Sequence, residues 1–221
     1  MILAAGRGER LRPLTESTPK PLVEVAGETL LGRHLANLSR AGYTDAVINV
    51  SHLAEQITAR YAEGSAPGIR IAWSVETEPL ETAGGIARAR PLLGPAPFLL
   101  VNADIWCDFE FAGFRGIELA NRMAHLLLVP NPRHHPEGDF SLQGDRVGNA
   151  SSPRYTYAGI AVLSPRLLAA IGDGTKAPLG PLLRAAAGRG EVSGEIHCGR
   201  WNDVGSPERL AELKMLLEGP R

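Results

Sequence analysis

Leu3-Ala4-Ala5-Gly6-Arg7-Gly8-Glu9-Arg10-Leu11-Arg12-Pro13 follows a short β-rich run and opens into a loop dense in glycine and arginine. Small residues let the backbone approach a ligand closely, and its amides can then bind phosphate oxygens. A dinucleotide-binding fingerprint would need a third glycine where Leu11 stands, and the Gly-Lys-Ser/Thr of a Walker loop is absent. The stretch therefore predicts a strand followed by a phosphate-binding loop of another type.

Short β-rich runs alternate with helical patterns through the first half of the chain. The predicted strands cover residues 1–5, 46–50, 69–75 and 98–102. Apolar residues fall at helical spacing after the first two of them, at Leu31, Leu35 and Leu38 and at Leu53, Ile57 and Tyr61. This order predicts parallel βαβ units with both helices covering the sheet, hence an α/β protein.

The second half of the chain is less regular. Further β-like runs occur at residues 125–129, 155–163 and 191–198, and a helix is expected to end the chain. That helix has a clear start, with Ser206 as N-cap, Pro207 in the first helical position and Glu208 in the first turn. No repeat or low-complexity tract divides the sequence, so a single domain over residues 1–221 is expected.

Composition excludes several classes of protein. The formal net charge is -1, so no global field attracts nucleic acid or a membrane surface, and neither is an expected partner. Cys107 and Cys198 match no disulfide framework or metal-binding spacing. Apolar runs are too short to span a bilayer and no leader precedes Met1, so a cytoplasmic protein is expected.

Lys20 lies between two prolines in Thr18-Pro19-Lys20-Pro21-Leu22. The chain has only three lysines but many arginines, so a lysine in a rigid turn suggests a site that needs a compact point charge. Taken alone, this feature is also what a solvated lysine in a surface loop would look like.

Two aspartates are candidate metal ligands. Asp104 lies two residues beyond the predicted strand at 98–102, and Asp203 precedes the final helix. In open α/β sheets, ligands bind beyond the carboxyl ends of the strands. Mg²⁺ takes one or two carboxylates and bridges substrate phosphates, so the pair predicts a magnesium site.

Five motifs in order resemble the signature of the sugar-1-phosphate nucleotidylyltransferases, also called nucleoside-diphosphate-sugar pyrophosphorylases. They are residues 3–15, residues 19–22, Glu78-Pro79-Leu80-Glu81-Thr82-Ala83-Gly84, Val101-Asn102-Ala103-Asp104 and Trp201-Asn202-Asp203-Val204-Gly205. The resemblance implies a Rossmann-like, doubly wound mixed sheet of the nucleotide-diphospho-sugar transferase type. It also implies transfer of a nucleotidyl group to a sugar 1-phosphate with release of pyrophosphate.

Site residues are implied position by position. Arg10, Lys20 and Asp104 would be catalytic, the two cations acting on the triphosphate, and Asp104 and Asp203 would bind Mg²⁺. The nucleotide would contact Ala4, Ala5, Gly6, Gly8, Glu9, Arg10 and Lys20. Glu76 and the turn at residues 79–84, which includes Glu81 and Thr82, would lie against the base. The sugar phosphate would face Asn102, Asp139, Asn149 and Gly159.

Within this family the segment at residues 79–85 looks most like that of the N-acetylmuramate-1-phosphate uridylyltransferases of cell-wall sugar recycling. UTP and N-acetylmuramate 1-phosphate are then the expected partners, bound by a monomer or small homo-oligomer. Mannose- or heptose-1-phosphate guanylyltransferases, which more often carry glycine in place of Glu81, are the alternative. A catalytically silent sugar-nucleotide-binding regulatory subunit is the non-enzyme alternative.

Two features remain open at this level. Longer relatives place a basic residue near the sugar phosphate, and Arg154 is the only evident match around residues 149–157. His134 and His135 lie in a polar, proline-flanked stretch, where a surface loop is expected rather than a metal site.

Overall fold

The computed structural model describes residues 1–62, 66, 68–150 and 153–219. Its α-helices are α1 (Leu14–Ser17), α2 (Leu30–Arg40), α3 (Ala54–Arg60), α4 (Glu81–Leu93), α5 (Leu179–Gly188) and α6 (Pro207–Glu218). Its strands are β1 (Ile2–Leu3), β2 (Glu24–Val25), β3 (Glu28–Thr29), β4 (Asp45–Val50), β5 (Arg70–Val75), β6 (Phe98–Asn102), β7 (Ile105–Cys107), β8 (Ala124–Val129), β9 (Phe140–Gln143), β10 (Arg146–Gly148), β11 (Arg154–Leu163), β12 (Val192–Ile196) and β13 (Trp201–Asp203).

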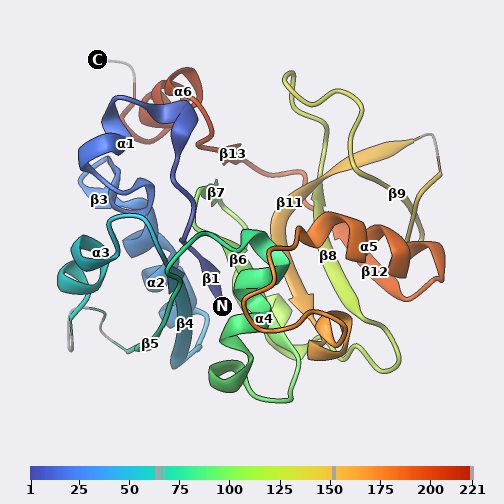
Figure 1. Cartoon of the computed structure of the whole chain (residues 1–221). Coiled ribbons are helices and arrows are strands. Elements are labelled where there is room, and N and C mark those ends of the chain that lie inside the picture. The colour runs from blue at the N-terminus through green and yellow to red at the C-terminus, as the bar shows by residue number, and fades with distance from the viewer. Residues whose placement is uncertain (63–65, 67, 151–152, 220–221) are drawn as a thin grey trace.

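One mixed sheet runs through the molecule, nine strands wide over the described residues, in the order β5-β4-β1-β6-β11-β8-β12-β10-β9 (Figure 1). β5, β4, β1 and β6 are parallel neighbours. β11 runs antiparallel to both β6 and β8, and β12 is parallel to β8. The predicted mixed α/β sheet is thus confirmed, although β1 is shorter than the run predicted at residues 1–5.

Helices cover both faces of this sheet because successive strand residues point to opposite sides. On one face Leu31, Leu35 and Leu38 of α2 pack with Ile2 of β1 and Ile48 of β4. On the other face the apolar residues of α4 and α5 pack with alternate residues of β6, β8 and β11. The two helices predicted in the first half, α2 and α3, pack on the same face of the sheet, since Ile57 of α3 belongs to the same cluster as the α2 leucines. With α4 and α5 on the other face, the sheet is doubly wound.

Two helices were missed by the sequence analysis. α4 begins at Glu81, within the segment expected to be a turn against the base, and its two adjacent glycines and Pro91 obscure any helical pattern. α5 lies in a stretch to which no element was assigned. In Figure 1 α4 lies in front of the sheet near β6, and α5 lies near β8 and β12.

A small third cluster attaches α6 to the first half of the chain. Leu210 and Leu213 of α6 pack with Leu11, Val23 and other apolar residues of the β2–β3 region. Ser206 caps the helix as predicted, since its hydroxyl accepts from Arg209 N at 3.4 Å, and Pro207 is the first helical residue. The start of α6 is thereby held beside the predicted phosphate loop. No helix in the described part of the chain is both long enough and apolar enough to cross a membrane.

Candidate active site

The carboxyl ends of the parallel strands meet at one edge of the sheet. Leu3 at the end of β1 is in register with Asn49 of β4 on one side and with Asn102 of β6 on the other. Glu76, the first residue after β5, donates its amide to Val50 O at 2.8 Å. The loops that leave these strands therefore begin at the same level, as expected for ligand sites in open α/β sheets.

A cleft of about 980 Å³ opens at this edge. Every residue predicted to contact the nucleotide lines it, namely Ala4, Ala5, Gly6, Gly8, Glu9, Arg10, Lys20, Glu76, Glu81 and Thr82, as do Asn102 and Asp104. Asp139, Asn149, Gly159 and Asp203 are not among the residues that line it. The predicted residues that the structure brings together here lie up to 100 positions apart in the sequence, from Ala4 to Asp104.

The phosphate loop, residues 4–10, is shaped by Gly8. Its φ of +64° is left-handed backbone that favours glycine. A Cβ there would lie 2.9 Å from Thr15 Cγ2 and 3.3 Å from Lys20 Cβ. Thr15 Oγ1 also donates to Gly8 O at 2.8 Å, so the loop packs directly against the segment that carries Lys20.

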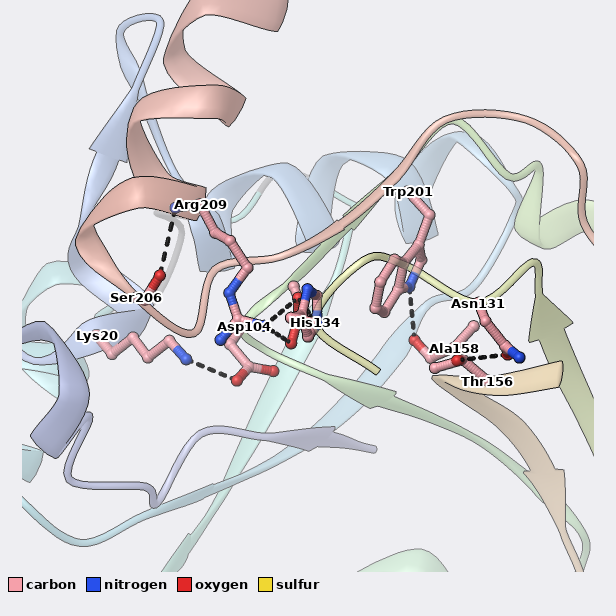
Figure 2. Close-up of polar contacts among 10 residues, drawn as sticks. Lys20, Asp104, Asn131, His134, Thr156, Ala158, Trp201, Ser206 and Arg209 are labelled. Atoms are coloured by element: carbon pink, nitrogen blue, oxygen red, sulfur yellow. Dashed lines mark hydrogen bonds and ion pairs between the residues drawn. The ribbon is translucent and has the colours of Figure 1, made fainter. Parts of the chain in front are cut away.

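Lys20 and Asp104 form an ion pair within the cleft. Lys20 Nζ lies 2.6 Å from Asp104 Oδ2, and the two side chains are 11% and 34% exposed. Figure 2 shows the two side chains pointing toward each other. The contact joins the turn after α1 to the second residue beyond β6. Because each charge is partly removed from water, the pair is stronger than one on an open surface.

Asp203 lies next to Asp104 but has partners of its own. Val204 N donates to Asp104 O at 2.8 Å, which places the two acidic residues on adjacent backbone segments. Arg209 Nη1 contacts both oxygens of Asp203, at 2.8 and 2.7 Å. His134 Nε2 lies 3.3 Å from Asp203 Oδ1, so Arg209 and His134 both contact the same carboxylate.

This contact revises the expectation for the two histidines. They do lie in a loop, residues 130–139, and their side chains are 41% and 39% exposed. His135 Nε2 lies 3.2 Å from Asp139 Oδ1, so both rings face acidic residues that were predicted in the site. Asn131 holds the loop, since its Nδ2 donates to Pro136 O at 2.9 Å and its Oδ1 accepts from Thr156 Oγ1 at 3.0 Å.

Glu76 lies in the wall of the cleft but is only 3% exposed. Its Oε1 accepts from Asn49 Nδ2 at 2.6 Å and its Oε2 accepts from Leu80 N at 2.9 Å. Both carboxylate oxygens are thus bound by donors of the protein itself. Asn49, which the sequence analysis did not single out, also lines the cleft.

The start of α4 also lines the cleft. Glu81 adopts a left-handed φ of +60° and lies 3.9 Å from Lys176, a cleft residue that was not predicted. Thr82 Oγ1 accepts from Leu179 N at 2.7 Å, and Ala177 N donates to Leu80 O at 3.0 Å. The segment that carries Lys176 is therefore fastened to α4.

The residues predicted on the sugar side are held largely by other protein groups. Asp139 Oδ2 accepts from Tyr157 N at 2.9 Å. Asn149 is exposed outside the cleft, and its Nδ2 donates to Arg184 O at 2.9 Å. Gly159 is buried behind Asn102, and a Cβ there would lie 2.7 Å from Asn102 Nδ2. Of this set, Asn102 is the member that reaches the cleft.

A protein-family sequence model described as nucleotidyl transferase matches residues 1–138 of the chain. The chain belongs to the nucleotidyl transferase family. The matched part contains the phosphate loop, Lys20, the segment at residues 76–84 and Asp104, which together form most of the cleft.

Relatives of this nucleotidyl transferase differ in how much of it they match. N-acetylmuramate alpha-1-phosphate uridylyltransferase of Neisseria meningitidis serogroup B is 47% identical, over 98% of this chain and 96% of that protein. Mannose-1-phosphate guanylyltransferase catalytic subunit beta of Drosophila pseudoobscura pseudoobscura is 46% identical, but over 50% of this chain and 31% of that protein. The crystal structure of HddC from Yersinia pseudotuberculosis in complex with GMP-PN shares the fold, with a TM-score of 0.79, 19% identity and 97% of each chain covered.

Sequence reasoning missed Asn49, Lys176, Arg209 and the contact made by His134. Asn49 could have been found, because it falls near the end of a predicted parallel strand, where open α/β sheets place ligand-binding residues. Nothing local marks the other three, which reach this nucleotidyl transferase's cleft or its acidic residues through the packing of distant segments. Cys107 is buried, and its burial raises the pKa of the thiol to about 11.

Proposed function

We propose that the chain transfers a uridylyl group from UTP to N-acetylmuramate 1-phosphate and releases pyrophosphate. The observation that carries this proposal is the end-to-end likeness to the Neisseria uridylyltransferase, combined with a cleft that presents Lys20 and Asp104 beside a glycine-rich loop. Related guanylyltransferases match only half of the chain. They therefore support nucleotidyl transfer as the reaction, but they do not support a particular sugar or base.

In this proposal the cleft binds UTP along its length. The amides of residues 4–10 bind the phosphates, and Arg10 and Lys20 contribute positive charge at the same end. The start of α4, with Glu81 and Thr82, lies beside the base. Asn102 lies at the end of β6 next to Asp104, where the sugar phosphate must enter to reach the α-phosphorus.

The donor chemistry at this end fits a divalent cation. Lys20 occupies one oxygen of Asp104, and Oδ1 remains outside that ion pair. In the described part of the chain no group of three or more His, Cys, Asp or Glu could hold a metal without substrate. Mg²⁺ is typically held by one or two carboxylates together with phosphates and water. Asp104 and Asp203 would hold Mg²⁺, which when bound would neutralise charge on the triphosphate.

The residues of the chain then have a positioning and electrostatic task. A phosphate oxygen of the sugar phosphate attacks the α-phosphorus in line, the α–β bridging bond breaks, and pyrophosphate leaves. No covalent intermediate with the protein is needed. Lys20 and Arg10 stabilise negative charge that grows on the leaving pyrophosphate, and such a cation typically contributes on the order of 3 kcal/mol to the transition state.

The lactyl carboxylate of muramate calls for an additional cation near the sugar. Arg154 is better placed for this role than Arg133, because its Nη2 donates to Asp139 O and its Nε is buried without a partner among the described residues. Arg133 is exposed in the 130–139 loop. We assign the carboxylate to Arg154 within this proposal.

The test is pyrophosphate release with matched pairs of substrates. UTP with N-acetylmuramate 1-phosphate is expected to give the highest kcat/KM. N-acetylglucosamine 1-phosphate lacks the carboxylate and leaves the donor of the site unpaired. This is expected to cost about 1–3 kcal/mol of transition-state stabilisation, which lowers kcat/KM roughly five- to 150-fold.

Two outcomes would contradict the proposal. Faster turnover of GTP with mannose 1-phosphate would make the chain a guanylyltransferase. Nucleotide binding without pyrophosphate release from any pair would make it a silent regulatory subunit.

A further inference from the structure

Two buried polar side chains connect opposite walls of the cleft. Asn49 Oδ1 accepts from Ala4 N at 2.9 Å, and Asn49 Nδ2 donates to Glu76 Oε1 at 2.6 Å. Glu76 Oε2 accepts from Leu80 N at 2.9 Å. The Asn49–Glu76 bridge therefore runs from the first residue of the phosphate loop to the residue that precedes α4.

The donors and acceptors along the Asn49–Glu76 bridge fix the orientation of the Asn49 amide. A backbone N–H can only donate and a carboxylate can only accept, so Asn49 must turn its oxygen to Ala4 and its nitrogen to Glu76. Asn49 and Glu76 are 2% and 3% exposed, so water does not replace either partner at low cost. Each hydrogen bond therefore depends on the next one along the bridge.

Helix α4 closes over the bridge. A Cβ on Gly85 would lie 2.6 Å from Glu76 Oε1 and 2.7 Å from Asn49 Nδ2, so glycine is required for this approach. Leu80 is the N-cap residue of α4, a helix of 13 residues. The negative charge of Glu76 thus lies at the positive end of the helix dipole, which stabilises it where a cationic side chain would otherwise be needed.

We propose that Asn49 and Glu76 act as a pair of positioning residues, which fix the distance between the phosphate loop and the start of α4. In this arrangement Glu76 is the partner of Asn49 and Leu80 and does not accept a hydrogen bond from the nucleobase. The inference rests on the proposed function in one respect, that these two walls bind the phosphate end and the base end of one nucleotide.

A swap of the two side-chain types tests the bridge. Glu76→Gln must turn a donor toward either Asn49 or Leu80, and Asn49→Asp sets two carboxylates against each other. The double variant N49D/E76Q restores every hydrogen bond with unchanged net charge. In it, the carboxylate introduced at position 49 accepts from Ala4 N and from the amide introduced at position 76, and the oxygen of that amide accepts from Leu80 N. Only the position of the negative charge differs from the wild type.

Two measurements are made on the full chain. Amide hydrogen exchange at Ala4 and Leu80, without ligand, is expected to accelerate in both single variants and to return toward wild-type protection in the double variant. The KM for UTP is expected to rise roughly tenfold or more in each single variant, with little change in the KM for the sugar phosphate, and to recover to within a few-fold in the swap. Glu55→Gln, which removes an exposed charge on α3, is the matched control.

Three results would overturn the proposal. One is a normal UTP KM in Glu76→Gln. The second is a swap that is folded, with protected amides, yet binds UTP as poorly as Glu76→Gln, because the charge of Glu76 would then act on the ligand itself. The third is a swap that does not fold. If the wild type fails to use UTP, the proposed function fails, but the exchange data still decide whether the bridge exists.

Discussion

The two halves of the sheet differ in how they place side chains at the cleft. In the parallel half, residues 1–104, each loop that leaves β1, β5 or β6 contributes residues to the cleft. In the mixed half, residues 124–203, the residues predicted to bind sugar phosphate contact other protein groups, as Asp139 does with Tyr157 N and Asn149 with Arg184 O. The family model also ends at residue 138, close to where this second arrangement begins.

This difference follows from strand direction. Parallel strands joined by helices all present their carboxyl ends at one edge, so a residue that directly follows a strand is placed by the connection itself. In the mixed half β8, β11 and β12 do not all run the same way, so sequence position gives neither the edge nor the face. Side chains there are positioned by long-range packing, and the predictions below probe each half in turn.

The largest effect is expected in the parallel half, from Asp104→Asn. Removing the carboxylate eliminates both the partner of Lys20 and the proposed metal ligand, so turnover is expected to fall by about a thousandfold at millimolar Mg²⁺ while the fold persists. Steady-state kinetics and circular dichroism check this. Asp173→Asn, an exposed acid near α5, is the control. Near-normal rates in Asp203→Asn would refute the assignment of the metal to this pair.

Lys20→Ala is expected to have the next largest effect. Loss of the ammonium leaves charge on the triphosphate without its partner, which lowers kcat/KM for UTP roughly a hundredfold. Lys214→Ala removes the same charge from an exposed position on α6 and is expected to change little. A defect limited to the KM for the sugar phosphate would show that Lys20 belongs to the other half of the reaction.

The same contrast explains what the sequence could predict. Strands β4, β5 and β6 were predicted to within one residue, and helices α2 and α3 were found where the apolar spacing indicated them, because their apolar periodicity is strong and their faces are buried. α4 was taken for a turn, because Gly84 and Gly85 are poor helix formers, and they occur there because the backbone passes close to Thr175 O and to the Asn49–Glu76 bridge. A tertiary contact thus overrode the local signal.

The candidate site likewise contains some residues that could be predicted from the sequence and others that could not. Lys20 and Asp104 could be predicted because a rigid turn and a strand end fix each of them locally. Arg209 and His134 could not, because they reach Asp203 through the packing of α6 and the course of the 130–139 loop. No local sequence pattern indicates which acidic residue a distant loop will contact.

A smaller effect is expected from Gly159→Ala, which tests whether the mixed half supports the cleft. The new Cβ would lie 2.7 Å from Asn102 Nδ2 and 2.9 Å from Ile105 Cγ1, at a φ of +75°. We expect a loss of about 1–3 kcal/mol of stability and a rise of roughly tenfold in the KM for the sugar phosphate. Gly144→Ala has a similar φ of +59° with nothing within 4 Å, so it reproduces the backbone strain alone. Equal sugar-phosphate KM values in the two variants would mean that Gly159 does not act through Asn102.

The smallest effect is expected from Asn131→Ala, which releases the 130–139 loop without touching the cleft. The substitution removes hydrogen bonds to Pro136 O, Arg154 O and Thr156 Oγ1, and so frees the loop that holds His134 beside Asp203. Because Arg154 is the proposed partner of the lactyl carboxylate, the KM for N-acetylmuramate 1-phosphate is expected to rise a few-fold, about 1 kcal/mol, while the KM for UTP stays constant. Asn121→Ala, at an exposed position before β8, controls for loss of an amide side chain.

An equal rise in the KM for N-acetylglucosamine 1-phosphate would show that the loop orders the sugar site as a whole rather than the group that recognises the carboxylate. A change in the KM for UTP would show instead that the mixed half also shapes the nucleotide end, and that the division between the two halves is not a functional one.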